Sequence, residues 1–314
     1  MDQLTESVNK ILMVSLLLVV MVDLVTAQQK QVCLSVDDLT VVNYGIEDTS
    51  FTFGITRSLI ETFDKYQIPA IGFVNETKVY TDGKVDDSKV KHLDLWLTSG
   101  YDLGNHTFAH LSYHKTPFDE YTAGILEGEK VLRPLMIEYK KELKYFRHPY
   151  LQVGLNKEAY DSLNQFLSDH AYLVAPITID NSDWRFASAY SNAYKNGDTE
   201  LMEKIGNAYV DYMEAVLVYY EKQSEKLFGR VIPQTLLTHA SYLNANYLDD
   251  VMERYVQQGY EFIDMDEALE DPVYQHEVTV FNNWGISWLD RWAMSEGKTK
   301  EFFQGEPEVP EFIK

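Results

Sequence analysis

The sequence contains a single cysteine, Cys33, among 314 residues. One cysteine cannot form an intramolecular disulfide, and it excludes metal sites built from several thiolates. Internal repeats, low-complexity tracts and Gly/Ser-rich linkers are also missing, so nothing in the sequence marks a chain of small modules. The fold must therefore rest on a hydrophobic core, for which 45% hydrophobic residues are ample.

Basic residues are scarce. The chain has 27 Lys and Arg against 49 Asp and Glu, a net charge of −22. Such a surface repels phosphate backbones and anionic membranes, so we expect no nucleic-acid partner. A neutral substrate, or one that releases an amine, suits this charge better than a polyanion.

Only the N-terminus carries a long hydrophobic run. Residues 11–27 follow Lys10 and end in small residues at Val25-Thr26-Ala27, which predicts a signal peptide over residues 1–27. Asp23 interrupts the run, and its apolar part is short for a bilayer span; an uncleaved anchor is the alternative. We therefore expect a secreted or periplasmic protein without stable membrane association after cleavage.

Short apolar runs alternate with segments of helical spacing along the rest of the chain. This alternation predicts right-handed βαβ units and a parallel sheet, with no hairpin. The expected fold class is α/β, an incomplete (β/α)7-type barrel of parallel strands; an open doubly wound sheet is the alternative. The expected strands are Val32–Val36, Ala70–Val74, Tyr101–Asn105, Leu143–Phe146, Ala171–Ile179, Gln234–Thr238 and Tyr260–Ile263.

A long excursion separates the fifth and sixth expected strands. An apolar stripe over Leu201–Tyr220 predicts a helix, and residues 185–199 before it are expected to form a loop. The helix is either a wall beside the site or a helix packed on the barrel. We expect residues 28–275 to form the catalytic domain, and residues 276–314, rich in tryptophan, to form a tail packed on the barrel.

Unusual polar clusters fall at the expected strand ends. In parallel α/β folds the carboxyl ends of the strands share one edge, where active sites form. Five clusters meeting there in chain order predict a single site. They are Asp37-Asp38 after the first strand, His106 and His110 after the third, Arg147-His-Pro-Tyr150 after the fourth, Asp180-Asn-Ser-Asp183-Trp184 after the fifth, and His239 after the sixth.

Each cluster alone has a plainer interpretation, such as a turn, a helix cap or a surface histidine. Together they supply one carboxylate and two imidazoles, a donor set that binds a metal and leaves positions open for water. Asp38, His106 and His110 are the candidate ligands, and Asp37 is left over as a general base. His114 continues the four-residue spacing on one potential helical face and is an alternative ligand.

In order, spacing and strand placement, the clusters between Cys33 and His239 resemble the motifs of the NodB-type polysaccharide deacetylases, carbohydrate esterase family 4. The resemblance implies an incomplete (β/α) barrel with a divalent metal in its mouth, usually Zn²⁺, with Co²⁺ plausible. It implies removal of N-acetyl groups from an acetylated glycan such as chitin or peptidoglycan.

The resemblance also implies a role for each matching residue. Asp37 would be the base that deprotonates the nucleophilic water, and Arg147 would pair with it. His239 would protonate the leaving amine, with its pKa raised by Asp183. The remaining implied roles are the metal ligands Asp38, His106 and His110, the oxyanion-binding N–H of Tyr150, and the apolar walls Trp184 and Leu237 around the acetyl methyl group.

The first motif departs from the family pattern, which has Phe before the aspartates and Gly-Pro after them. Here Val36 precedes them and Leu39-Thr40 follows, so we expect a loop that does not need the φ freedom of glycine. Three alternatives stay open: hydrolysis of O-acetyl esters, hydrolysis of a small cyclic amide, and a glycan-binding barrel without turnover.

Overall fold

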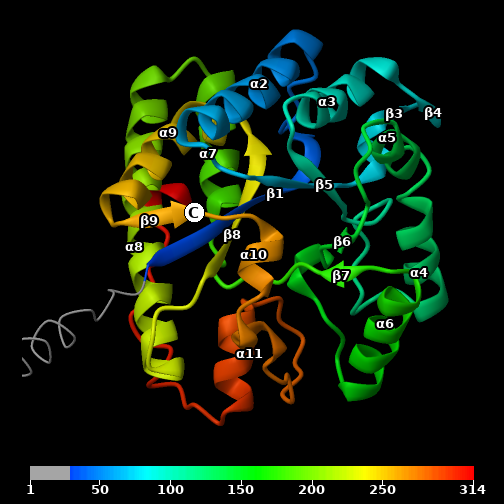
Figure 1. The fold of residues 1–314 in the computed structure, drawn as a ribbon. Helices are drawn as coiled ribbons and strands as arrows, with labels where there is room; N and C mark the ends of the chain where they lie inside the picture. Colours follow the sequence, from blue (N-terminus) through cyan, green and yellow to red (C-terminus); the bar gives the residue numbers. More distant parts are fainter. Residues whose placement is uncertain (1–28) are drawn as a thin grey trace, which may run out of the picture.

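A computed structural model describes residues 29–314, which form a barrel-like sheet surrounded by helices (Figure 1). The main sheet has seven strands in the order β7-β6-β5-β2-β1-β8, with β9 beside β1, and every pair is parallel. All seven lie within or overlap the runs expected from the sequence. They are β1 (Lys30–Val42), β2 (Ile71–Val74), β5 (Asp102–Asn105), β6 (Tyr145–Phe146), β7 (Leu173–Val174), β8 (Gln234–Ser241) and β9 (Tyr260–Phe262).

The sheet curves until the chain beyond β7 meets β8 at the opposite edge. The N–H of Thr178 donates to the carbonyl of Thr235 at 3.1 Å, and the N–H of Leu237 donates to the carbonyl of Ile179 at 3.3 Å. Ile179 and Leu236 form a parallel bridge there. The two edges of the sheet therefore meet; the incomplete barrel is confirmed and the open doubly wound alternative is wrong.

Helices cover the outside of the barrel (Figure 1). Several begin at a residue whose side chain accepts a backbone N–H of the first turn, as Asp48, Asn156 and Asp198 do. The α-helices are α2 (Thr49–Tyr66), α3 (Asp87–Thr98), α4 (Phe118–Glu127), α5 (Leu132–Glu138), α6 (Lys157–Asp169), α7 (Asp183–Lys195), α8 (Thr199–Phe228), α9 (Tyr242–Gln257), α10 (Met265–Leu269) and α11 (Trp288–Ser295). The 3₁₀ turns are η1 (Glu76–Val79), η2 (Pro149–Leu151), η3 (Pro272–Gln275) and η4 (Glu311–Ile313).

The excursion between β7 and β8 is helical almost throughout. The stripe expected from residue 201 lies in the 30-residue helix α8, so that helix is confirmed. The loop expected over residues 185–199 is wrong, because α7 occupies most of it. Phe186 and Tyr190 of α7, spaced by one turn, are buried, and the Phe186 ring packs 5.7 Å from that of Tyr209 on α8.

A short hairpin also contradicts the sequence-based expectation. Strands β3 (Tyr80–Thr81) and β4 (Lys84–Val85) pair antiparallel around Asp82-Gly83. Both turn residues have positive φ, 50° and 73°. An Asp-Gly pair is a strong signal for this kind of turn, so the hairpin was predictable.

Residues 276–314 contain α11, whose Trp288 and Trp292 are buried. The ring of Trp292 contacts Phe228 at the end of α8 and Tyr274 of η3. Over residues 29–314, no helix combines the length and apolar character needed to cross a bilayer. The predicted signal peptide over residues 1–27 lies outside the described residues.

Candidate metal centre and catalytic site

Asp37 and Asp38 lie inside β1, not after it as expected. The pairing register of β1 shifts between Val36 and Leu39 against β2, and after Asp37 against β8. Asp38 itself adopts a left-handed φ of 64° within this irregular stretch. Aspartate tolerates this conformation better than most residues. Leu39 and Thr40, which follow the aspartates, do not have positive φ, so the expectation that the loop does not need the φ freedom of glycine is confirmed.

His106 and His110 follow β5 on a loop, so the helical face expected for them and His114 is wrong. Thr107 and His110 have φ of 67° and 52°, which breaks any helical path. The loop still brings both imidazoles to β1. His106 Nε2 lies 3.8 Å and His110 Nε2 lies 3.7 Å from Asp38 Oδ1, and the three donor atoms all lie within 4.8 Å of one another.

This donor set fits a divalent cation. Burial lowers the pKa of both His106 and His110, so both imidazoles are neutral and free to coordinate. His106 Nδ1 lies 2.8 Å from the carbonyl of Arg147, which orients Nε2 toward the site. Asp38 Oδ1 is buried and has no hydrogen-bond partner among the described residues. Separations of 3.7–3.8 Å are too long for hydrogen bonds and suit donors that share one ion.

His114 does not join these ligands. Its Nε2 accepts a hydrogen bond from the N–H of Gly154 at 3.3 Å, and it is absent from the described group of potential ligands. The alternative of a site with three histidines is therefore wrong for this structure.

Lys78, on η1, is a contributor that the sequence did not reveal. Its ammonium donates to the carbonyl of Asp38 at 2.6 Å and to that of Val41 at 3.3 Å. It thereby holds the main chain at the left-handed residue and three residues beyond it. A lone lysine in a turn carries no sequence signal for such a contact, because the two segments are far apart in the chain.

Asp37 is paired with a fully buried Arg147, from the loop after β6. Arg147 Nη1 lies 3.1 and 3.2 Å from the two carboxylate oxygens. The same guanidinium donates to the carbonyl of Ala175 and to the hydroxyl of Ser35, so its position is fixed. Burial raises the pKa of Asp37 to about 6, and the charge of Arg147 only partly opposes that rise. The pKa of Asp37 therefore lies close to neutral pH, which suits a general base.

His239 and Asp183 form a second pair across the site. His239 Nδ1 lies 2.7 Å from Asp183 Oδ1, and Asp183 Oδ2 accepts the N–H of His239 and the side-chain amide of Asn244. Burial alone would lower the pKa of His239, but the neighbouring carboxylates, Asp183 first, outweigh it and raise the pKa to about 9. His239 is therefore cationic at neutral pH.

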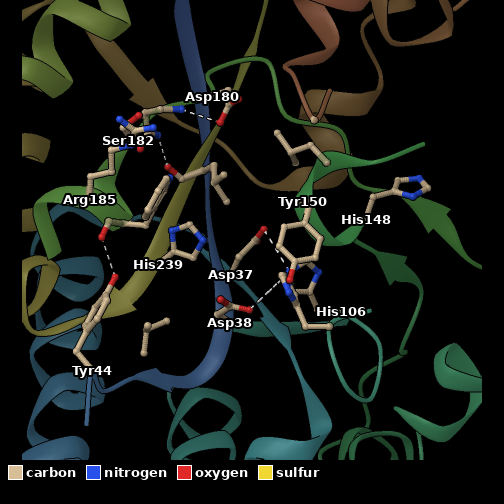
Figure 2. A pocket seen from close by; sticks show the side chains of 17 residues that line it. Asp37, Asp38, Tyr44, His106, His148, Tyr150, Asp180, Ser182, Arg185 and His239 are labelled. Atoms are coloured by element: carbon tan, nitrogen blue, oxygen red, sulfur yellow. Dashed lines mark hydrogen bonds and ion pairs between the residues drawn. The ribbon is translucent and has the colours of Figure 1, made fainter. Parts of the chain in front are cut away.

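These groups meet in one pocket of about 590 Å³. Asp37 and Asp38 lie between His239 on one side and His106 and Tyr150 on the other (Figure 2). The Tyr150 ring lies 4.4 Å from that of His110, and Tyr150 has a left-handed φ of 57°. The pocket contains every predicted site residue except Arg147 and Asp183, which lie directly behind Asp37 and His239.

The two residues expected to form apolar walls differ in exposure. Leu237 is buried, whereas Trp184 is half exposed. The guanidinium of Arg185 lies 5.0 Å from the centroid of the Trp184 ring. Asp180 also lines the pocket, and burial raises the pKa of its carboxyl to about 7. The sequence placed Asp180 in this cluster without giving it a role.

Residues 25–166 match the family model described as polysaccharide deacetylase. No curated protein matches the chain significantly. Similar solved structures include a peptidoglycan deacetylase of Bacillus subtilis, with 17% identity over 79% of this chain and 95% of that chain and a TM-score of 0.47.

Two further structures are similar at the same level. A family 4 acetyl xylan esterase of Clostridium thermocellum, in complex with a cobalt ion, has 17% identity over 77% of this chain and 91% of that chain, with a TM-score of 0.48. A CE4 family pseudoenzyme of Bacillus anthracis has 13% identity over 77% and 66%, with a TM-score of 0.46. The segment that matches the family model carries Asp37, the three candidate ligands and Arg147, so this part of the chain is similar to the polysaccharide deacetylase family.

Proposed function

We propose that the protein is a metal-dependent hydrolase that removes N-acetyl groups from an acetylated glycan. One observation carries the proposal. A single pocket brings together the Asp38, His106 and His110 donor set, the buried carboxylate of Asp37 and the cationic His239. Amide hydrolysis needs a base for the water and an acid for the amine, and these two groups are of the right kind.

A bound divalent metal, in our proposal Zn²⁺ or Co²⁺, would supply Lewis-acid polarisation of the acetyl group and a lower pKa for water. Asp38, His106 and His110 would hold it. Asp37 takes the proton of the attacking water, and Arg147 orients that carboxylate. His239, held by Asp183, gives a proton to the departing amine. The N–H of Tyr150 donates to the oxyanion, and Leu237 and Trp184 enclose the acetyl methyl group.

The shape of the pocket favours an oligosaccharide over a small cyclic amide. Trp184 and Arg185 line this pocket and also a second hollow of about 470 Å³ that extends to Ile313 and Lys314. A half-exposed tryptophan between two hollows provides a flat apolar surface, against which sugar rings stack. The two hollows together suit a chain of several rings.

The experiment is an acetate-release assay with metal-loaded protein. N-acetylglucosamine oligomers, peptidoglycan fragments, O-acetylated xylan and small cyclic amides are compared at equal concentration. We expect release from an N-acetylated glycan, at a rate that rises with oligomer length. Turnover of the cyclic amide alone would overturn the glycan proposal. Binding of glycans with no turnover of any substrate would favour the non-catalytic barrel.

We further propose that the protein acts outside the cytoplasm, secreted or periplasmic, after cleavage behind Ala27. Only the hydrophobic leader of the sequence supports this. N-terminal sequencing of protein recovered from the culture medium or periplasm tests it, and an intact Met1 on protein inside the cell would contradict it.

A further inference from the structure

The turn that carries Tyr150 has an uncommon backbone. Tyr150 and Leu151 both adopt left-handed φ, 57° and 51°, although neither is glycine, asparagine or aspartate. Residues other than glycine are strained in this conformation and keep it only where their surroundings impose it. Something outside the turn must therefore hold residues 148–151.

The C-terminal segment contacts three of these four residues. Arg291 of α11 donates from Nη2 to the carbonyl of Leu151 at 2.7 Å. Gly285 lies so close to Tyr150 that a Cβ built on it would meet the Tyr150 carbonyl oxygen at 1.7 Å. The third contact is between rings: Trp288 lies 5.9 Å from His148, which points away from the aspartates (Figure 2).

The burial of Arg291 is hard to explain by packing alone. The residue is 1% exposed, and within the described part of the chain no carboxylate forms an ion pair with it, although Asp290 and Asp180 are near enough to favour its charge. Its bonded acceptors are the carbonyls of Leu151 and Trp284. Burying a guanidinium without an ion-paired carboxylate is unfavourable, and an apolar residue would fill the same space with less loss of stability. The unfavourable burial of Arg291 is explained if its guanidinium fixes the turn.

We propose that residues 284–291 act as a clamp that sets the Tyr150 turn, with Arg291 as a positioning residue for the oxyanion-binding N–H of Tyr150. The clamp lies beyond residue 166, outside the segment that matches the family model. Its catalytic consequence rests on the proposed deacetylase function, whereas its effect on the turn does not.

Two kinds of variant test the clamp. Gly285→Ala places a methyl group against the Tyr150 carbonyl from an exposed position, so the protein should fold while the turn shifts. Gly54→Ala, on α2, is the matched control, because nothing lies within 4 Å of its added Cβ. Arg291→Met removes the donor, and Arg291→Lys keeps one donor for the Leu151 carbonyl.

Hydrogen exchange of the peptide covering residues 148–153 reports the turn, and zinc titration reports the metal site. We expect Gly285→Ala and Arg291→Met to speed exchange in that peptide, leave zinc affinity within about twofold, and lower kcat about 10- to 100-fold with little change in KM. Complete loss of one oxyanion donor costs about 10²–10³ in kcat, which sets the upper bound. Arg291→Lys should restore part of kcat, and Gly54→Ala should match the parent.

Unchanged exchange in Gly285→Ala and Arg291→Met would overturn the clamp. Faster exchange with unchanged kcat would overturn its catalytic role. If the parent protein deacetylates nothing, the proposed function fails, while the exchange data still decide whether the C-terminal segment holds the turn.

Discussion

His239 and Asp183, 56 positions apart, are joined by two hydrogen bonds: the imidazole Nδ1 lies 2.7 Å from one carboxylate oxygen, and the His239 N–H donates to the other at 2.8 Å. The pair fixes both the orientation of the ring and its protonation. His239 therefore presents Nε2 to the pocket as a proton donor.

This pair makes the alkaline side of the pH–rate profile predictable. The pKa of His239 is raised to about 9, so the acid form prevails at neutral pH, and kcat should fall as the pH rises through about 9. Asp183→Asn removes the negative charge that contributes most to raising the pKa of His239. The alkaline limb should then move down toward about 6.5, the ordinary value for histidine. An unmoved limb in this variant would show that another group is the acid.

Asp37 and Asp38 are neighbours with unlike expected roles. Asp38→Asn should lower zinc affinity, because it changes a ligand. Asp37→Asn should keep zinc while kcat falls by about 10²–10⁴, the usual cost of removing a general base. Zinc content by elemental analysis and acetate release, measured on both variants, check this. Loss of zinc in Asp37→Asn together with its retention in Asp38→Asn would reverse the assignment.

The histidines offer a matched comparison. His110→Ala removes a ligand and should weaken zinc binding by more than about 100-fold, the upper range for losing a residue that only supports a ligand. His114→Ala is the control, since His114 bonds Gly154 away from the donor set. Equal zinc affinity in His110→Ala and the parent would show that the donor set is wrong.

Lys78 should affect the zinc affinity of the same site without being a ligand. Lys78→Met removes the bonds to the carbonyls of Asp38 and Val41, so the left-handed conformation at Asp38 loses support and zinc affinity should drop about 10-fold. Lys89→Met is the control, because Lys89 also donates to a main-chain carbonyl, that of Tyr80, on the hairpin side. If both variants bind zinc like the parent, Lys78 serves the fold alone.

Part of the fold and of the site could be predicted from the sequence. The strands were predictable because each is a short apolar run, and the parallel topology then gathered Asp37, His106, Arg147 and His239 at one edge. Helix α7 was missed because much of its buried face consists of small residues, Ala187, Ser191 and Ala193, which give a weak apolar signal.

Contacts between distant segments were beyond reach of the sequence. Lys78 and Arg291 act through main-chain carbonyls, which leave no trace in residue identity. The positive φ at Asp38 and at Tyr150 follows from tertiary packing, since neither position holds the glycine that would have signalled it.

The most direct test of the central claim is acetate release from an N-acetylglucosamine oligomer by metal-free protein and by the same protein reloaded with one equivalent of Zn²⁺. The account predicts release only after reloading, with Co²⁺ also effective and Asp37→Asn inactive in its zinc-loaded form. Equal release by the metal-free and zinc-loaded protein would contradict the account.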